Sequence, residues 1–140
     1  MFKHLTAQDV FLLQSWNIPN FSWSDKRYQE YLKKKTMYGW FVDDVLKSFI
    51  VADGIDPEIE ILLLATDPNC RRQGYGLLIL KQFIHWCQKE KKEDIFLEVE
   101  ESNIAAIKLY TTLGFISYNR RIGYYGPNRN ALLLRKSLWN

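Results

Sequence analysis

The chain has 140 residues, of which 47% are hydrophobic and 25% charged, and its formal net charge is +3. This length favours one domain over residues 1–140 with a sizeable core, and no apolar run is long enough to span a membrane. The small net charge gives no support for direct nucleic-acid binding. The five tryptophans are also not interleaved with arginines, as a base-stacking surface would require.

The two cysteines, Cys70 and Cys87, match no metal spacing and are too few for a disulfide framework. We therefore expect a reducing compartment and no bound metal. Residues 1–4 do not resemble a signal peptide, which favours a cytoplasmic protein. Residues 1–70 carry 7 Lys/Arg against 10 Asp/Glu, whereas residues 71–140 carry 12 against 6. The basic half suits an anionic ligand, although a solvated basic surface is the commoner cause of such asymmetry.

Two helices are predicted in the first quarter of the chain. Thr6 is a candidate N-cap with Asp9 three residues later, a variant of the capping box. Residues 17–20 break this helix. Ser24 is the candidate cap of the second helix, and Lys33–Lys35 lie near its C-terminal end, where the helix dipole favours cations.

Three strands of an antiparallel meander are predicted next, because β-branched and aromatic residues alternate with turn residues. The turns fall at Asp43-Asp44 and Asp53-Gly54. The strands cover Met37–Val42, Val45–Ala52 and a segment that begins near Glu58.

The stretch from Ile59 to Gly76 predicts a strand, a loop and the start of a helix. An apolar run is halted by Asp67-Pro68, a polar loop follows, and apolar residues at helical spacing continue to about Lys89. Glycine has no Cβ, so Gly74 and Gly76 would let backbone N–H groups approach an anion at the positive end of the helix dipole. This predicts a pyrophosphate site. The dinucleotide and P-loop patterns do not fit, and the alternative is a tight turn that needs two glycines for steric reasons.

The rest of the chain predicts a parallel crossover followed by a final pair of strands. A strand at 95–99 completes a right-handed βαβ unit with the strand that begins near Glu58. Asn103 and its neighbour Ser102 cap a helix over 104–113. The last two strands begin at 115 and 131, on either side of a turn-rich loop at 124–128. The order ααβββαβαββ predicts an α/β fold with a mixed central sheet.

Two motifs together resemble the GNAT N-acetyltransferases. Arg71-Arg72-Gln73-Gly74-Tyr75-Gly76 is similar to their acetyl-CoA signature, Gln/Arg-x-x-Gly-x-Gly/Ala. Leu97–Phe115 closely resembles their Leu-Glu-Val-x-x-x-Asn-x-x-Ala-Ile-x-Leu-Tyr-x-x-x-Gly-Phe block, particularly in the bacterial ribosomal-protein alanine N-acetyltransferases of the RimI type. Phe21–Ser24 and Arg120–Tyr125 extend the resemblance over essentially the whole chain.

The resemblance implies a GNAT fold, acetyl-CoA as cofactor and a role for each matching residue. Glu98 matches the general base and Tyr110 the general acid, although from the residues alone they could be an exposed strand residue and a core tyrosine. Trp23, Tyr124 and Tyr125 match the borders of the acceptor groove. The positions that match cofactor contacts are Leu64, Ala65, Thr66, Arg71, Arg72, Gln73, Gly74, Tyr75, Gly76, Leu77 and Asn103.

The sequence departs from the RimI pattern at two places that concern the acceptor. Glu100 stands where the pattern usually has Arg, and Arg129-Asn130 stands where it usually has an acidic pair. A substrate-binding Glu100 would favour a basic residue early in the acceptor. The resemblance implies acetylation of a protein N-terminus, such as that of a ribosomal protein. A GNAT enzyme that acts on lysine or a small amine, and a non-catalytic acetyl-CoA-binding module, are the alternatives.

Overall fold

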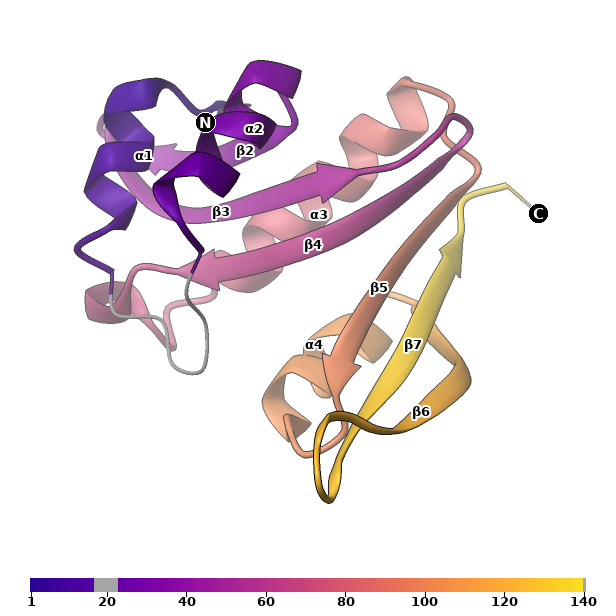
Figure 1. Cartoon of the computed structure of the whole chain (residues 1–140). Coiled ribbons are helices and arrows are strands. Elements are labelled where there is room, and N and C mark those ends of the chain that lie inside the picture. Colours follow the sequence, from indigo (N-terminus) through magenta and orange to yellow (C-terminus); the bar gives the residue numbers. More distant parts are fainter. Residues whose placement is uncertain (17–22, 140) are drawn as a thin grey trace. The chain divides into compact units, whose positions relative to one another are not determined.

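The computed structural model describes residues 1–16 and 23–139, and it contains a mixed sheet with the strand order β1-β2-β3-β4-β5-β7-β6 (Figure 1). The predicted helix break at 17–20, and Phe21 and Ser22 of the resemblance, lie outside these residues. No helix in the described part of the chain is long and apolar enough to cross a membrane. The elements are β1 (Phe2–His4), α1 (Ala7–Leu13), α2 (Asp25–Lys34), β2 (Met37–Val42), β3 (Val45–Asp53), β4 (Glu58–Thr66), η1 (Pro68–Cys70), α3 (Tyr75–Lys89), β5 (Asp94–Glu100), α4 (Ile104–Thr112), β6 (Ile116–Gly126) and β7 (Arg129–Ser137).

The chain forms two units, and β4 and α3 each contribute to both. The first unit comprises Met1–Asp53 and Leu63–Ile84. The second comprises Gly54–Leu62 and His85–Asn140. The α/β class and the mixed sheet confirm the predicted fold class. The prediction of one domain over residues 1–140 stays a prediction.

In the first unit, side chains from both faces of the β2–β3 hairpin are buried. On one face Phe49 packs against Trp16, with ring centroids 5.6 Å apart. On the other, Tyr38 packs against Phe83 of α3 at 5.7 Å. Five consecutive residues of β3, Ser48–Ala52, are buried as a result. A strand covered on both faces loses the alternation of buried and exposed residues that a half-exposed strand shows.

The predicted helix starts are confirmed by their capping geometry. The Thr6 side chain accepts a hydrogen bond from the Asp9 N–H, and the Asp9 carboxylate accepts one from the Thr6 N–H at 2.8 Å. The Ser24 side chain caps α2 in the same way. The predicted order lacked β1, which pairs antiparallel with β2. Three residues are too few to show a strand period, and the ladder with β2 makes them a strand.

In the second unit, the first residues of β4 run parallel to β5, and β7 lies between β5 and β6 (Figure 1). Ile95, Leu97 and Val99 of β5 are buried, and the residues between them are half-buried. The predicted turn-rich loop at 124–128 is wrong in its first part, because β6 extends to Gly126. Gly126, Pro127 and Asn128 made this segment resemble a turn, but irregular pairing of β6 with β7 keeps Tyr124 and Tyr125 in the strand.

The β2–β3 turn offers a test of backbone strain. Asp43 and Asp44 both have positive φ, 49° and 64°, as the type I′ hairpin turn requires. Asp44→Gly should stabilise the fold by roughly 0.5 kcal/mol in chemical denaturation, because glycine avoids the left-handed penalty but loses more chain entropy on folding. Asp44→Ala is the matched control, since it removes the same charge but keeps Cβ. Equal stabilisation by both variants would assign the effect to repulsion between the two aspartates.

Candidate active site

The loop between β4 and α3 is held by short-range hydrogen bonds. Asp67 caps η1, with its Oδ1 accepting from the Asn69 N–H at 2.9 Å. Its carbonyl oxygen accepts from the Cys70 N–H at 2.8 Å. Pro68 occupies the first turn, where its missing N–H costs nothing. The end of β4 is thus turned into the polar loop as the sequence predicts.

The start of α3 has the backbone geometry of an anion site. Gly74 has φ +83°, and nothing lies within 4 Å of the position that a Cβ would occupy there. Its carbonyl oxygen accepts the N–H of Leu78 at 3.0 Å, which begins the helical ladder. The N–H groups of Tyr75, Gly76 and Leu77 belong to the first turn, whose donors have no partner within the helix. Of the other predicted contacts, Arg71, Arg72 and Gln73 are exposed.

The first unit adds a cation beside this loop that the sequence analysis missed. Lys47 is half-buried on β3, with Nζ 3.7 Å from the Cys70 sulfur and 5.9 Å from the centroid of the Tyr75 ring. The neighbouring Ser48 donates a hydrogen bond to the Tyr75 carbonyl oxygen at 3.1 Å. The sequence signal that could have identified Lys47 was a lysine within the largely apolar predicted strand Val45–Ala52.

The last residues of β4 take no part in the ladder with β5. Among the described residues, that pairing runs from Glu58 opposite Asp94 to Ile61 opposite Leu97. The predicted cofactor positions 64–66 lie beyond its end, at the C-terminal end of β4.

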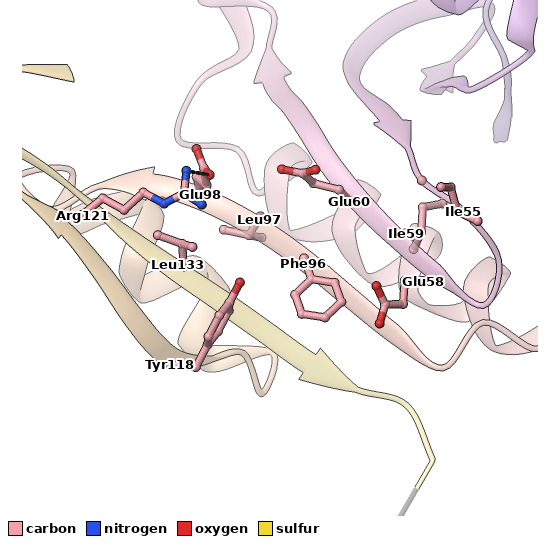
Figure 2. Close-up of a pocket in the computed structure, with 11 residues that line it drawn as sticks. Ile55, Glu58, Ile59, Glu60, Phe96, Leu97, Glu98, Tyr118, Arg121 and Leu133 are labelled. Carbon is pink, nitrogen blue, oxygen red and sulfur yellow. Dashed lines mark ion pairs between the residues drawn. The ribbon is translucent and has the colours of Figure 1, made fainter. Parts of the chain in front are cut away.

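In the second unit, Glu98 lies in β5 with its carboxylate paired to Arg121 of β6 (Figure 2). The distance from Nη1 to Oε1 is 3.4 Å, and the Glu98 side chain is 24% exposed. A hydrogen bond to Glu98, together with its charge, raises the pKa of Tyr124. The Arg121 guanidinium also lies 5.4 Å from the Tyr124 ring centroid. In the sequence analysis Arg121 is only one residue of the Arg120–Tyr125 resemblance, whereas in the structure it forms an ion pair with Glu98.

Tyr110 is buried in α4, and its ring packs edge-on against Phe115 with centroids 5.9 Å apart. Burial, with a smaller contribution from Tyr125, raises the pKa of Tyr110 to about 12. The phenol therefore keeps its proton at neutral pH. At the start of the same helix, Asn103 Oδ1 accepts the Ala106 N–H at 3.1 Å, which confirms its predicted capping role.

The two departures from the family pattern meet in one ion pair. Arg129 donates to both carboxylate oxygens of Glu100, at 2.6 and 3.2 Å. Ser102 donates a further hydrogen bond at 3.0 Å. The hydrogen bonds from Arg129 and Ser102 hold the pKa of Glu100 below its ordinary value. Arg129 offsets the charge of Glu100, which weakens the expectation that Glu100 by itself attracts a basic acceptor residue.

The predicted groove residues fall in both units. Tyr124 and Tyr125 pack edge-on in β6 with ring centroids 5.0 Å apart. Both the Glu98 charge and burial raise the pKa of Tyr125, burial more strongly. Trp23 belongs to the first unit, where the Arg27 guanidinium lies 4.2 Å from its ring centroid. The structure thus brings Glu98 together with two predicted groove residues of its own unit. The role of Trp23 stays a prediction.

The comparisons with known proteins agree with this arrangement. The acetyltransferase (GNAT) family matches residues 9–115. A [ribosomal protein bS18]-alanine N-acetyltransferase of Salmonella typhimurium is 32% identical over 110 residues, covering 75% of this chain and 72% of that protein.

Two solved structures show the same fold. The ribosomal-protein-S18-alanine N-acetyltransferase from Escherichia coli has a TM-score of 0.89 and 24% identity over 100% of this chain and 94% of that chain. A chain of the NatC complex bound to Gag peptide and CoA has a TM-score of 0.83 and 23% identity, covering 99% of this chain and 98% of that chain. The family match and the curated relative confirm the resemblance found in the sequence, and the chain belongs to the GNAT family of acetyltransferases.

Proposed function

We propose that this acetyltransferase moves the acetyl group of acetyl-CoA to the N-terminal α-amine of a protein, by direct attack in a ternary complex. The observation that carries the proposal is the environment of Glu98. Its half-buried carboxylate lies on the face of the sheet near Arg121, Tyr124 and Tyr125. Tyr110, which keeps its proton at neutral pH, lies in α4, the helix that follows β5 in the chain. The relatives support the acceptor, since the Salmonella protein is named for an alanine of a ribosomal protein and the NatC structure holds a peptide.

The residues of the β4–α3 loop fit the cofactor. The first-turn N–H groups of α3 and the open space at Gly74 suit a pyrophosphate, and Arg71, Arg72 and Lys47 supply positive charge nearby. We assign the backbone of Leu64–Thr66, at the C-terminal end of β4, to the pantetheine amides, as the resemblance implies. We assign Asn103 to the same cofactor. Acetyl-CoA supplies an activated thioester, and its leaving group is a thiolate.

Glu98 would take the proton of the acceptor amine. A protein α-amine has a pKa of about 7.7–8.0, so most of it carries an extra proton at neutral pH and cannot attack a carbonyl. A carboxylate within reach, or one water away, removes that proton before the nitrogen attacks, and the second proton lost on forming the amide passes to solvent. Arg121 fixes the Glu98 carboxylate through the 3.4 Å contact. Glu98 is thus held ready to act as a base.

Tyr110 would act on the leaving group, the thiolate of CoA. A phenol with a pKa of about 12 keeps its proton at neutral pH. It can therefore donate a hydrogen bond to the leaving sulfur as negative charge develops there. Because burial makes the phenol a weak acid, its main effect would be to stabilise the negative charge on the sulfur by this hydrogen bond, with or without full transfer of the proton. The proton taken up by Glu98 returns to solvent.

The charges of the acceptor groove differ from the RimI pattern, because Glu100 and Arg129 stand where that pattern has an arginine and an acidic residue. We propose that the Glu100–Arg129 pair, rather than Glu100 alone, borders the acceptor path together with Trp23, Tyr124 and Tyr125. A lysine or a small amine would use the same base and the same cofactor loop. A cytoplasmic location and the absence of a nucleic-acid partner are part of the proposal and come from the sequence.

The acceptor class is tested with a panel of peptides that differ in their first residue. We expect acetylation of free α-amines, detected by mass spectrometry, with kcat/KM well above that of N-blocked peptides whose only amine is a lysine. Spermidine and other free amines should be poor acceptors. Faster turnover of a blocked lysine peptide or of spermidine than of every free N-terminus would refute the proposed acceptor and leave the acetyltransferase assignment intact.

The cofactor loop is tested with Gly74→Glu. A carboxylate placed in the open space at Gly74 would repel the pyrophosphate, so calorimetry should detect no CoA binding. Gly123→Glu is the control for backbone strain, because Gly123 also has positive φ (+66°) but lies in β6. It should bind CoA like the wild type. Near-normal CoA affinity in a folded Gly74→Glu variant would remove this loop from the cofactor site.

The acid–base roles are tested with Glu98→Gln and Tyr110→Phe. Each should lower kcat by about 10²- to 10⁴-fold, the usual contribution of general acid–base catalysis, and leave CoA affinity almost unchanged. Glu90→Gln, an exposed change beyond the end of α3, is the control and should keep full activity. If both site variants retain nearly the wild-type kcat while folded by circular dichroism, proton transfer belongs to other groups or to water.

A further inference from the structure

A pocket of about 490 Å³ opens on the sheet face of the second unit, and Glu98 lies at one end of it (Figure 2). The residues come from the β3–β4 turn and from the four strands of this unit. Among them, Leu97, Glu98 and Arg121 belong to the motifs that resemble the GNAT family. The lining residues are Gly54, Ile55, Glu58, Ile59, Glu60, Phe96, Leu97, Glu98, Tyr118, Arg121 and Leu133.

One part of the pocket is apolar and aromatic. Phe96 lies in the middle of the lining residues, and Leu133 of β7 is also part of the lining (Figure 2). The Tyr118 ring meets the Phe96 ring edge-on with centroids 6.0 Å apart. Such a surface suits a chain of methylene groups, which gains from leaving water.

The charged groups of the pocket are mainly acidic. Three carboxylates, Glu58, Glu60 and Glu98, and one guanidinium, Arg121, line the pocket, and Arg121 is paired with Glu98. Another cation on this face, Arg135, lies 6.0 Å from the Phe96 ring centroid, but its Nε is bound to Asp94 at 2.9 Å. The pocket as a whole therefore favours a cation.

The ladder between β4 and β5 places the two extra carboxylates at a defined distance from the base. Glu60 is opposite Phe96, two residues before Glu98 on the same face of β5, and Glu58 is two residues further. Each such step is about 7 Å along a strand. Glu98 and burial raise the pKa of Tyr124, and the charge of Glu60 makes the smallest contribution in the same direction.

We infer that this pocket binds the side chain of a lysine or arginine at the second or third residue of the acceptor. The aliphatic stem would lie on Phe96 and Tyr118, and the cationic group would reach Glu60 and Glu58. An extended peptide covers about 7 Å in two residues, so a chain whose amine is at Glu98 brings these side chains to the pocket. The inference rests on the proposed acetylation of a protein N-terminus. It names Glu58 and Glu60 as specificity-determining residues.

The test compares peptides that differ at one position, lysine against norleucine, which has the same aliphatic stem without the charge. The wild type should prefer the lysine peptide by roughly fivefold in kcat/KM at low salt, a typical gain from a partly exposed ion pair. In the Glu58→Gln/Glu60→Gln variant the preference should fall to about one, because the lysine peptide loses the two carboxylates that its charge would reach. Glu90→Gln is again the matched control and should keep the preference.

Binding is measured in parallel, so that this inference and the proposed function can fail separately. Calorimetry with CoA and each peptide should show tighter binding of the lysine peptide to the wild type only. If no peptide is acetylated but this difference in binding is found, the proposed acceptor is wrong and the pocket stands. Equal binding of the two peptides, or a lysine preference that survives in the double variant, overturns the pocket. Displacement of the lysine peptide by equimolar spermidine also overturns it, because the occupant would then be a small free cation.

Discussion

The placement of Glu98 depends on β5, which is paired on both sides and buried on one face only. Parallel pairing with β4 and antiparallel pairing with β7 fix its register. Burial of Ile95, Leu97 and Val99 then forces the residues between them onto the other face. A slip of one residue would bury the carboxylates and expose the aliphatic side chains, at a cost that no local contact could offset. The base is thus positioned by the hydrophobic core beneath it.

Acidic residues in and next to β5 are balanced by arginines from the C-terminal hairpin. Asp94 pairs with Arg135, Glu98 with Arg121, Glu100 with Arg129 and Glu101 with Arg120. The arginines are about half exposed, and pairs of this kind contribute little to stability. Their larger effect is on geometry, since each guanidinium limits where its carboxylate can point. The sequence asymmetry of positive charge in the second half arises partly from this set and only partly from the loop at Arg71 and Arg72.

Local signals in the sequence were sufficient for most of the fold, whereas Glu98 was predicted as the base only through the resemblance to the GNAT family. Thr6, Ser24 and Asn103 act as helix caps, and a cap depends on residues within one turn. What the sequence could not provide were partners far apart in the chain. The Glu100–Arg129 pair joins residues 29 positions apart, and the pocket at Phe96 is assembled from four strands. β1 and the end of β6 were missed for the same reason, because pairing with a distant strand defines them.

The exchanged charges at Glu100 and Arg129 have an evolutionary consequence. Starting from an Arg at the first position and an acid at the second, a single change of sign would place two like charges within hydrogen-bond distance, which is unfavourable. Both changes, or a neutral intermediate at one position, are needed to reach the present pair. The two positions therefore constrain one another, because the residue tolerated at one depends on the charge at the other.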